Sequence, residues 1–550
     1  MLDSSLSVTS ILRHGASVFG DSSVVTCTAD GSRRATFRDV ADRATRLAGG
    51  LRALGVTGDD RVATFMWNNQ EHLEIYLAAP SMGAVLHTLN IRLFPEQITF
   101  IAEHADDKIV IVDCSLVPLF APVLPNLHTV RTVVVVGDGA DEAKATLASS
   151  GKDVHTYDEV LALGSSTFDW PEVDERSAAA MCYTSGTTGD PKGVVYSHRS
   201  MYLHSFAVCT GNVTAMTVDD SILPIVPMFH ANAWGLPYAA FMAGAGLTMP
   251  DRFLQAEPLV RFMRAEKPTL AGAVPTIWND LLNWLHANPG NDDSVRSLRK
   301  VLCGGSAVPR SLMQAFDSEL GVEIFQAWGM TETSPVATAA HSPAGVSDEV
   351  KWDLRSTQGR ILFGVEARIV DDEGDVQPWD GKAVGEIQVR GPWVTGSYYK
   401  GADPDRYIDG WLRTGDVGLI DPHGYLTLTD RAKDVIKSGG EWISSVDLET
   451  TLIAHPDIVD VAVVGVPDER WQERPLAAVV LKDGVAADAA TAEAIRTWLA
   501  DRVVKWWLPE RWAFVDAVPR TGVGKYDKKV VRKAYADGEL SVVELAGQSA

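Results

Sequence analysis

The chain has 550 residues, of which 46% are hydrophobic and 22% are charged, as in an ordinary globular protein. A single hydrophobic core rarely extends over that length, so we expect at least two domains. The formal net charge of −23 argues against nucleic acid as a partner, because phosphate backbones are bound by basic surfaces.

Cysteine usage and the N-terminus indicate the compartment. The cysteines are odd in number and scattered, without a C-x-x-C pair, which argues against a disulfide framework and a zinc site and favours the cytoplasm. They are Cys27, Cys114, Cys182, Cys209 and Cys303. The N-terminus lacks a basic region, so we expect no signal peptide.

One long stretch, from Ser221 to Pro250, contains no charged residue apart from His230. Prolines and glycines interrupt it repeatedly, and a membrane-spanning helix rarely tolerates so many. We therefore expect no transmembrane segment here. A buried strand, loop and helix that line a pocket explain the stretch better.

Strands and helices alternate from Leu6 to about Pro171. Apolar residues recur at helical spacing from Phe37 to Leu51, and strand-like runs cover 61–66, 109–112 and 132–136. This alternation predicts a parallel sheet in an α/β layer architecture. The run at 133–139 is also compatible with a dinucleotide fold, but no G-x-G-x-x-G follows it, so a plain buried strand is favoured.

Residues 183–193 read Tyr-Thr-Ser-Gly-Thr-Thr-Gly-Asp-Pro-Lys-Gly. Glycines allow backbone N–H groups to turn inward, hydroxyls add donors, and Lys192 adds a positive charge, which together suit a triphosphate. A flexible surface loop is the alternative, but two apolar, strand-like segments flank the stretch. It is not a P-loop, because Gly193 replaces the Ser/Thr that would bind magnesium.

This stretch resembles the signature loop of the adenylate-forming, or AMP-binding, superfamily, which includes acyl-CoA synthetases, luciferases and peptide-synthetase adenylation domains. Matching motifs continue almost to the C-terminus and are most similar to those of bacterial medium- and long-chain fatty acyl-CoA synthetases. The resemblance implies an α/β fold with a large N-terminal domain, residues 1–430, built of two α/β subdomains and a small β-barrel-like subdomain. It is hinged to a small α+β C-terminal domain, residues 431–550. The implied cofactors are ATP, Mg²⁺ and coenzyme A.

The resemblance assigns roles to residues of the first domain. The loop residues that hold the β- and γ-phosphates are Thr184, Ser185, Gly186, Thr187, Thr188, Gly189 and Lys192. Thr184 and Glu332 are assigned to the metal, and carboxylate oxygens are ligands that Mg²⁺ prefers. The residues assigned to the adenine and the α-phosphate are Gly305, Ser306, Ala307, Gln326, Ala327, Trp328, Gly329, Met330 and Thr331. We expect Trp328 to stack on the purine.

Two further segments complete this predicted site. Residues 226–235 offer aromatic and small side chains for an acyl pocket, with His230 beside the carboxylate and Trp234 along the chain; ordinary core packing is the alternative for each. No carboxylate stands there to pair with the ammonium group of an amino acid. From about Lys351 to Thr429 short strands alternate with turns and predict the β subdomain. There Asp416 is assigned to the ribose, although a turn aspartate would explain it alone.

Residues 430–443 are charged and glycine-containing, and they read as the hinge. The resemblance makes Lys433 the pivot and assigns Arg431 to the ribose. It places Lys437, Gly439 and Gly440 beside the pantetheine arm and Trp442 beside the acyl chain. Beyond the hinge, a strand at 461–466, a helix at 491–504 and a strand at 512–515 precede a Thr/Gly loop that ends in the expected catalytic Lys525.

These assignments predict an AMP-forming acid–CoA ligase for a fatty or other apolar acid. ATP would activate the acid as acyl-AMP with release of pyrophosphate, and coenzyme A would accept the acyl group. Three alternatives stay open: an aryl-acid ligase, a ligase for short or thioether acids, and an adenylating enzyme with another acceptor. The sequence does not fix chain length, and a homodimer is possible.

Overall fold

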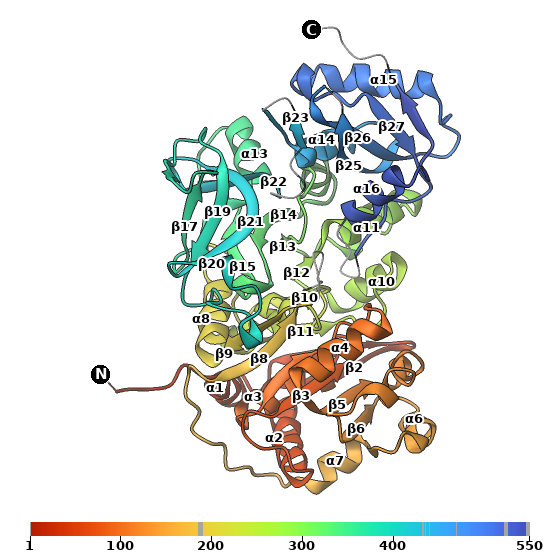
Figure 1. The fold of residues 1–550 in the computed structure, drawn as a ribbon. Helices are drawn as coiled ribbons and strands as arrows, with labels where there is room; N and C mark the ends of the chain where they lie inside the picture. Colours follow the sequence, from red (N-terminus) through yellow and green to blue (C-terminus); the bar gives the residue numbers. More distant parts are fainter. Residues whose placement is uncertain are drawn as a thin grey trace.

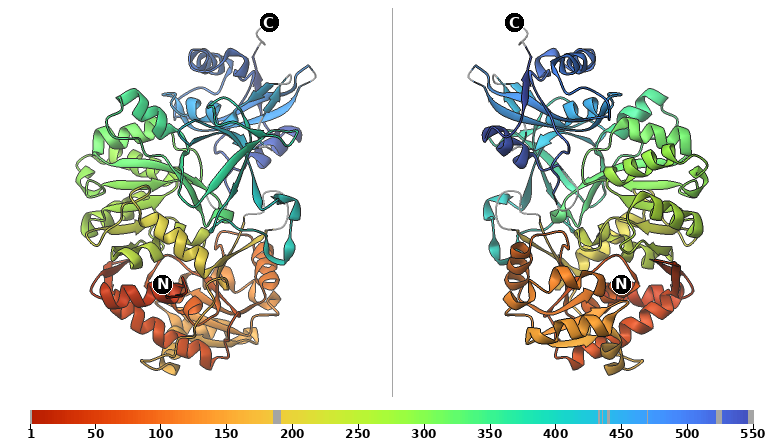
Figure 2. Two further views of the ribbon diagram at one scale, coloured as in Figure 1. Left: turned by 90° about the vertical axis from the view of Figure 1, so that its left-hand side faces the viewer. Right: turned by 90° about the vertical axis from the view of Figure 1, so that its right-hand side faces the viewer.

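The computed structural model describes residues 2–184, 191–431, 434, 436–438, 441–468, 470–521 and 526–545, with the backbone alone at 430, 431, 437, 441 and 442. The chain runs from the N-terminal sheet at the bottom of Figure 1, through a second sheet, to the C-terminal domain at the top. Two side views show the same order (Figure 2).

The first sheet has seven described strands in the order β7-β6-β5-β3-β4-β8-β9. Neighbours run parallel except for β8 and β9, which form an antiparallel pair. The strands are β3 (Arg61–Phe65), β4 (Val85–Thr88), β5 (Asp107–Asp113), β6 (Thr132–Val136), β7 (Asp153–Thr156), β8 (Ala178–Tyr183) and β9 (Gly193–Ser197). The predicted parallel α/β layer is confirmed, and β6 is the expected plain buried strand.

The second sheet contains a parallel core in the order β14-β13-β12-β10-β11-β1, with β2 at its edge. Its strands are β1 (Ser23–Thr28), β2 (Gly31–Thr36), β10 (Ser221–Pro224), β11 (Gly246–Met249), β12 (Leu270–Ala273), β13 (Lys300–Cys303) and β14 (Glu323–Gly329). The first 171 residues therefore do not all belong to one sheet. The hairpin β1–β2 pairs with β11 instead.

An antiparallel subdomain continues this sheet beyond β14 through β15. Its strands are β15 (Val336–Ala339), β16 (Gly359–Ile361), β17 (Glu366–Val370), β18 (Val376–Gln377), β19 (Gly385–Arg390), β20 (Tyr407–Ile408), β21 (Trp411–Ile420) and β22 (Tyr425–Arg431). The expectation of strands from Lys351 was wrong at its start. A helix, α13 (Asp348–Ser356), lies there, and Ser347 caps it by accepting a hydrogen bond from the Val350 N–H.

The C-terminal domain is a mixed sheet in the order β24-β23-β26-β27-β28, with β25 against β26. Its elements are β23 (Ile436–Ser438), β24 (Glu441–Ile443), α14 (Ser445–Leu452), β25 (Ile458–Asp468), β26 (Gln472–Leu481), α15 (Ala489–Ala500), β27 (Arg511–Phe514), α16 (Lys528–Ala536) and β28 (Val542–Glu544). Part of the predicted hinge thus forms strands of this sheet. The helix expected to reach residue 504 ends at Ala500.

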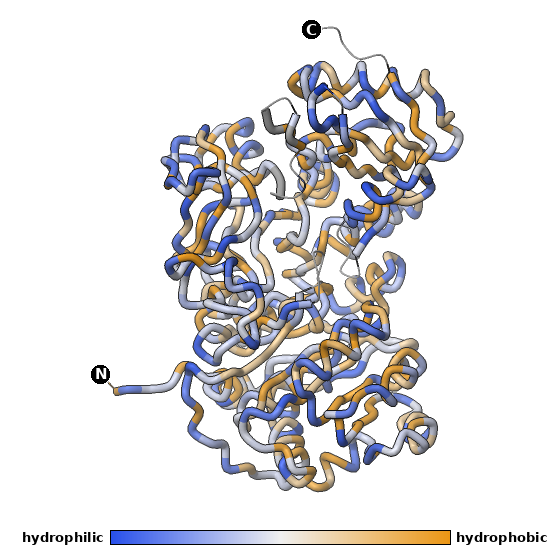
Figure 3. The backbone as a smooth tube through the Cα atoms, viewed as in Figure 1, coloured by the Kyte–Doolittle hydropathy of each residue, from blue (hydrophilic) through white to orange (hydrophobic). Residues whose placement is uncertain are grey.

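Helices cover the sheets of the large domain. They are α1 (Val8–Val18), α2 (Phe37–Ala53), α3 (Gln70–Ser81), α4 (Pro95–Ala105), α5 (Val117–Phe120), α6 (Ala140–Leu147), α7 (Tyr157–Leu163), α8 (His198–Cys209), α9 (Leu236–Ala243), α10 (Ala256–Glu266), α11 (Pro275–Ala287) and α12 (Arg310–Ala315). Hydrophobic residues gather on the inner strands, whereas many loops and outer helix faces are hydrophilic (Figure 3). No helix among the described residues is long and apolar enough to cross a bilayer.

Candidate active site

The ends of the glycine- and hydroxyl-rich loop meet at the end of the β8–β9 pair. The Thr184 N–H donates to the Lys192 carbonyl at 2.9 Å, and the Lys192 N–H donates to Thr184 Oγ1 at 3.2 Å. The antiparallel strands therefore fix the base of the loop. The other predicted phosphate-binding residues, Ser185, Gly186, Thr187, Thr188 and Gly189, lie outside the described residues.

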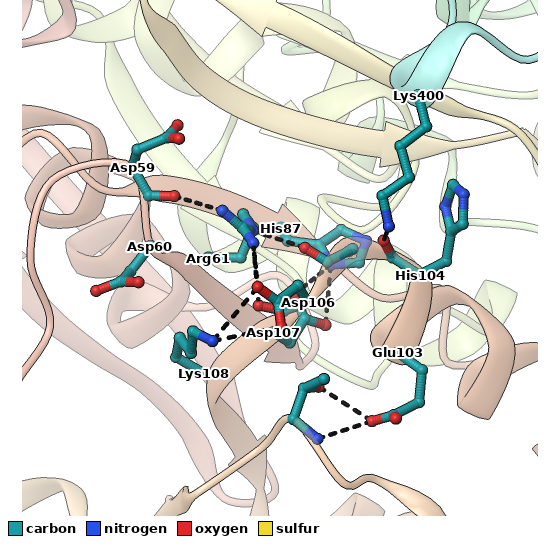
Figure 4. A network of polar contacts seen from close by, with 12 residues as sticks. Asp59, Asp60, Arg61, His87, Glu103, His104, Asp106, Asp107, Lys108 and Lys400 are labelled. Carbon is teal, nitrogen blue, oxygen red and sulfur yellow. Dashed lines mark hydrogen bonds and ion pairs between the residues drawn. The ribbon is translucent and has the colours of Figure 1, made fainter.

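A polar network supports the β8 side of this base. The Tyr183 hydroxyl and His104 Nδ1 are hydrogen-bonded at 2.7 Å, and Lys400 Nζ donates to the His104 carbonyl at 2.8 Å. Beneath them lies the fully buried pair of His87 Nδ1 and Asp107 Oδ1 at 2.8 Å, where burial raises the pKa of Asp107. Figure 4 shows Lys400 reaching from the β subdomain to α4. The network thus ties the loop to two parts of the fold.

Tyr398 connects Lys192 to Glu332. Lys192 Nζ forms an ion pair with Asp403 and lies 5.3 Å from the centre of the Tyr398 ring. The Tyr398 hydroxyl donates to Glu332 Oε1. Burial raises the pKa of Tyr398, so its hydroxyl stays protonated and serves as a donor. The structure therefore brings the predicted phosphate-binding lysine and the predicted metal-binding carboxylate to one place.

Glu332 fits a magnesium ion held largely by other oxygens. Glu332 is buried, with 4% of the residue exposed, and its Oε1 accepts the tyrosine hydrogen bond. The described part of the chain contains no group of three or more His, Cys, Asp or Glu side chains that could hold a metal. Mg²⁺ commonly uses one or two carboxylates together with water and substrate phosphates, which agrees with a single carboxylate at this position.

The predicted adenine-binding segments lie side by side. The Val308 N–H donates to Gln326 Oε1 at 2.6 Å, so Gln326 on β14 holds the turn that contains Gly305, Ser306 and Ala307. The contact is so close that a Cβ atom on Gly304 would lie 2.8 Å from the Ala327 carbonyl oxygen. Glycine is needed here because no side chain fits between the turn and the strand.

The predicted adenine and ribose residues are in direct contact. The Trp328 indole N–H donates to Asp416 Oδ2 at 2.8 Å, and both side chains are buried. Asp416 lies on β21, not in an isolated turn, and pairs through the backbone with Arg431 on β22. Thr331 lies nearby in the chain, and its carbonyl accepts a hydrogen bond from the Tyr196 hydroxyl at 2.8 Å.

The predicted acyl-binding segment has an uncommon backbone. Four residues from Ala231 to Trp234 have φ between 43° and 57°, in the left-handed region, and Gly235 continues them at 71°. Such conformations are costly for non-glycine residues and persist where packing holds them. Trp234 is 7% exposed, and a Cβ atom on Gly304 would lie 3.7 Å from its ring. The half-buried His230 precedes this turn.

Comparison with known proteins agrees with this arrangement. Residues 12–399 match the family described as AMP-binding enzyme, and residues 447–525 match the AMP-binding enzyme C-terminal domain. The chain belongs to the AMP-binding enzyme family.

Three known proteins show how far the similarity extends. A 3-methylmercaptopropionyl-CoA ligase of Ruegeria pomeroyi is 42% identical, with 98% of each chain covered. A long-chain-fatty-acid–CoA ligase of Thermus thermophilus is 43% identical, with 97% of this chain and 96% of the relative covered. The crystal structure of the anthranilate CoA ligase AuaEII in complex with anthranoyl-AMP has a TM-score of 0.86 at 25% identity and covers 98% of this chain and 99% of that chain. The predicted family and fold class are confirmed.

The C-terminal residues predicted for this AMP-binding enzyme are described only in part. Lys437 on β23 and Trp442 on β24 are cross-strand neighbours by their Cα register. Their side chains, together with that of Arg431, lie outside the description, as do Lys433, Gly439, Gly440 and Lys525 entirely. The roles assigned to them stay predictions.

Sequence reasoning missed the residues that join the site of this AMP-binding enzyme. Tyr398 and Asp403 contact predicted site residues, and His104 contacts Tyr183 directly before the predicted loop, yet none of the three was predicted from the sequence. The adjacent pair Tyr398-Tyr399 in a stretch rich in glycine and small residues was the available signal. Tyr398 and Tyr196 also line a cavity of about 480 Å³ between β9 and residues 392–401.

Proposed function

We propose that the acid which this enzyme joins to coenzyme A is apolar and of the fatty acid type. The reaction itself is ATP-dependent acid–CoA ligation through acyl-AMP, since the chain is an AMP-binding enzyme and its relatives at 42–43% identity are named acid–CoA ligases. ATP, Mg²⁺ and coenzyme A are the reactants and cofactor of that chemistry.

One observation carries the proposed substrate class. The segment from residue 226 to 236 contains no acidic or basic side chain except His230, and Phe229, Ala231, Ala233 and Trp234 are all buried. An acid that carries an ammonium group would need a nearby carboxylate, because an unpaired buried charge is costly. An apolar chain needs only apolar contacts.

The first half-reaction depends on positioning and on neutralising charge. The substrate carboxylate attacks the α-phosphorus of ATP and expels pyrophosphate, and this step requires little acid–base chemistry. We assign Thr184–Thr188 and Lys192 to the β- and γ-phosphates, and Lys525 to the carboxylate and the α-phosphate. A magnesium ion bound at Glu332 and Thr184 would neutralise phosphate charge.

The nucleoside is held by the pair described above. Trp328 would cover the purine while its N–H orients Asp416 toward the ribose hydroxyls, with Arg431 beside them. Because Asp416 and Trp328 are hydrogen-bonded, the contacts to the ribose and to the base would depend on each other. His230 would border the carboxylate, and Trp234 would line the acyl chain.

The second half-reaction needs another arrangement of the C-terminal domain. We propose that the domain begins after residue 430 and turns about Lys433, which withdraws Lys525. Lys437, Gly439 and Gly440 would then flank the pantetheine arm, and Trp442 would contact the acyl chain. The thiol of coenzyme A attacks the acyl carbon and displaces AMP, so no side-chain nucleophile is required.

A short thioether acid is the second candidate. The relative named 3-methylmercaptopropionyl-CoA ligase is as similar to this chain, at 42%, as the long-chain ligase is at 43%. Identity therefore does not separate a short thioether chain from a long hydrocarbon chain. Both substrates are apolar and uncharged beyond the carboxylate, so both are compatible with the apolar, buried segment at 226–236.

Pyrophosphate release with a panel of acids tests the proposal. The panel contains pentanoate, octanoate, hexadecanoate, benzoate, 3-(methylthio)propanoate and alanine, each with and without coenzyme A. Pentanoate and 3-(methylthio)propanoate form a matched pair, because sulfur replaces one methylene group. We expect activity with the apolar acids and none with alanine. Activity confined to alanine or to benzoate would contradict the proposed class.

Two further parts of the proposal concern assembly and location. A homodimer, implied by the resemblance, is tested by sedimentation of the purified chain. All five cysteines lie in the described residues and are free thiols, which supports the expected cytoplasmic location.

A further inference from the structure

Asp460 contacts both ends of the segment that carries Lys525. Arg520 Nη2 donates to Asp460 Oδ2 at 2.7 Å, and the Tyr526 hydroxyl donates to Asp460 Oδ1 at 2.6 Å. Arg520 also lies over the Tyr526 ring, 4.7 Å from its centre. Tyr526 directly follows Lys525 in the sequence. One carboxylate therefore holds the residues on either side of residues 521–525.

Backbone contacts also join the two ends of this segment. Arg520 and Tyr526 form an antiparallel bridge, and the Asp527 N–H donates to the Pro519 carbonyl at 2.8 Å. Directly after it, α16 is fixed to the domain by Lys528, whose Nζ lies 2.9 Å from Glu449 Oε1. The base is thus a short hairpin joined to a fixed helix. Its side-chain anchor is Asp460.

The bulge in β25 explains the direction of Asp460. The register of β25 against β26 shifts between Ile458 and Asp460, and such a bulge changes the direction in which the following side chains point. The Val461 N–H donates to Asp460 Oδ1 at 3.1 Å and helps to fix the carboxylate. Burial raises the pKa of Tyr526, so its hydroxyl stays a donor.

The base of the segment faces the large domain. Asp280 on α11 lies close enough to the base for both ends of the anchor to act on it. Burial has the largest effect and raises the pKa of Asp280, Asp460 raises it further, and Arg520 lowers it. Figure 1 shows α11 and α16 next to each other at the junction of the domains. The anchor therefore lies at the side of the C-terminal domain that is close to α11 of the large domain.

We propose that Asp460 is a positioning residue for the first half-reaction, which fixes both ends of the segment so that Lys525 is delivered in one orientation. This inference rests on the proposed function, in which Lys525 serves adenylate formation alone. A catalytic group that is displaced by about 1 Å can lose about a hundredfold in rate.

Separate assays of the two half-reactions test the proposal. The first is acid-dependent exchange of pyrophosphate into ATP, and the second is thioester formation from supplied acyl-AMP and coenzyme A. We expect Asp460→Ala to lower the first by about tenfold to a hundredfold and to leave the second within about twofold. Equal loss of both rates would indicate a structural role and would overturn the proposal.

Two other variants distinguish a specific role of Asp460 from a general loss of folding. Tyr526→Phe keeps the ring under Arg520 and removes one of the two hydrogen bonds that join Asp460 to the ends of the segment. We therefore expect a smaller loss in the exchange assay than with Asp460→Ala. The matched control is Glu493→Ala, which removes an ion pair with Arg496 on α15 of the same domain. The control should leave both half-reactions unchanged. A loss of exchange activity in the control equal to that in Asp460→Ala would contradict a specific role.

The variant Lys525→Ala separates this inference from the proposed function. If Lys525→Ala lowers only the exchange rate, and adding Asp460→Ala lowers it no further, then Asp460 acts through Lys525. If the two losses multiply, Asp460 acts independently and the inference fails although the proposed function stands. If Lys525→Ala leaves the exchange rate intact, the proposed function fails.

Discussion

Trp328 donates its indole N–H to the carboxylate of Asp416 at 2.8 Å, although 88 residues separate the two in the chain. The contact joins β14 of the parallel core to β21 of the antiparallel subdomain. It couples the side chain proposed to cover the purine to the one proposed to bind the ribose.

Replacing Trp328 with phenylalanine should therefore weaken ATP binding. The variant keeps an aromatic face but loses the hydrogen bond that orients Asp416, and bonds to charged groups contribute about 1.5–3 kcal/mol. We expect KM for ATP to rise about tenfold or more, with a smaller change in KM for the acid, in steady-state assays. Trp278→Phe is the control, because its buried N–H has no partner among the described residues. An unchanged KM for ATP would show that the contact does not orient Asp416.

Removal of the Tyr398 hydroxyl should change the magnesium requirement. Tyr398→Phe keeps the ring next to Lys192 but leaves Glu332 without the donor at Oε1. Removing a group that orients a metal ligand commonly lowers the metal affinity by about tenfold to a hundredfold. We expect the Mg²⁺ concentration at half-maximal pyrophosphate release to rise about tenfold at fixed ATP. Tyr399→Phe, its neighbour, should leave that concentration unchanged; an equal rise in both variants would exclude Glu332 as the cause.

Asp403 forms an ion pair with Lys192, the lysine that we propose binds the phosphates of ATP. The ion pair is partly exposed, with side-chain exposures of 27% for Lys192 and 33% for Asp403, and pairs of this kind contribute only about 0.2–1 kcal/mol. Asp403→Asn should release the lysine for phosphate and lower KM for ATP by up to about fivefold. A higher KM would mean instead that Asp403 holds Lys192 in the binding position.

Much of the local structure could be predicted from the sequence. Glycine turns and buried apolar runs are short-range signals, and the two strands predicted to flank the stretch at 183–193 were found at the expected place. Contacts such as Trp328 with Asp416 and Lys192 with Asp403 could not be predicted, because they depend on how the antiparallel subdomain continues the second sheet. No pattern in the chain encodes the pairing of β14 with β15.

The helix α13 shows how a local pattern can mislead. Val350, Trp352 and Leu354 alternate with polar residues, which is typical of a half-buried strand. The helix forms because Ser347 caps it and because Asp348 and Glu349 stand in its first turn, where acidic groups are favourable. The capping signal was present in the sequence, and it outweighed the alternation.

Glu74 should make the stability of the large domain depend on pH near neutrality. It is fully buried among α2, α3 and α7, and its carboxylate accepts hydrogen bonds from Arg43, Gln70 and Tyr157. Burial raises its pKa from 4.5 to about 7, although Arg43 acts in the opposite direction. The folded state thus favours the protonated carboxyl group more than the unfolded chain does.

The sign of the effect follows from this raised pKa. The contribution of protonated Glu74 to the free energy of unfolding is fully present below pH 4.5. This contribution is lost as the pH rises through the folded-state pKa of about 7. The shift corresponds to about 3 kcal/mol in total. Glu74→Gln cannot ionise, so its thermal midpoint should fall less than that of the wild type between pH 5 and pH 8. Parallel profiles for the two proteins would show that Glu74 does not titrate in this range. A steeper fall in the variant than in the wild type would show that Arg43 stabilises the ionised Glu74 of the wild type more strongly than burial disfavours it.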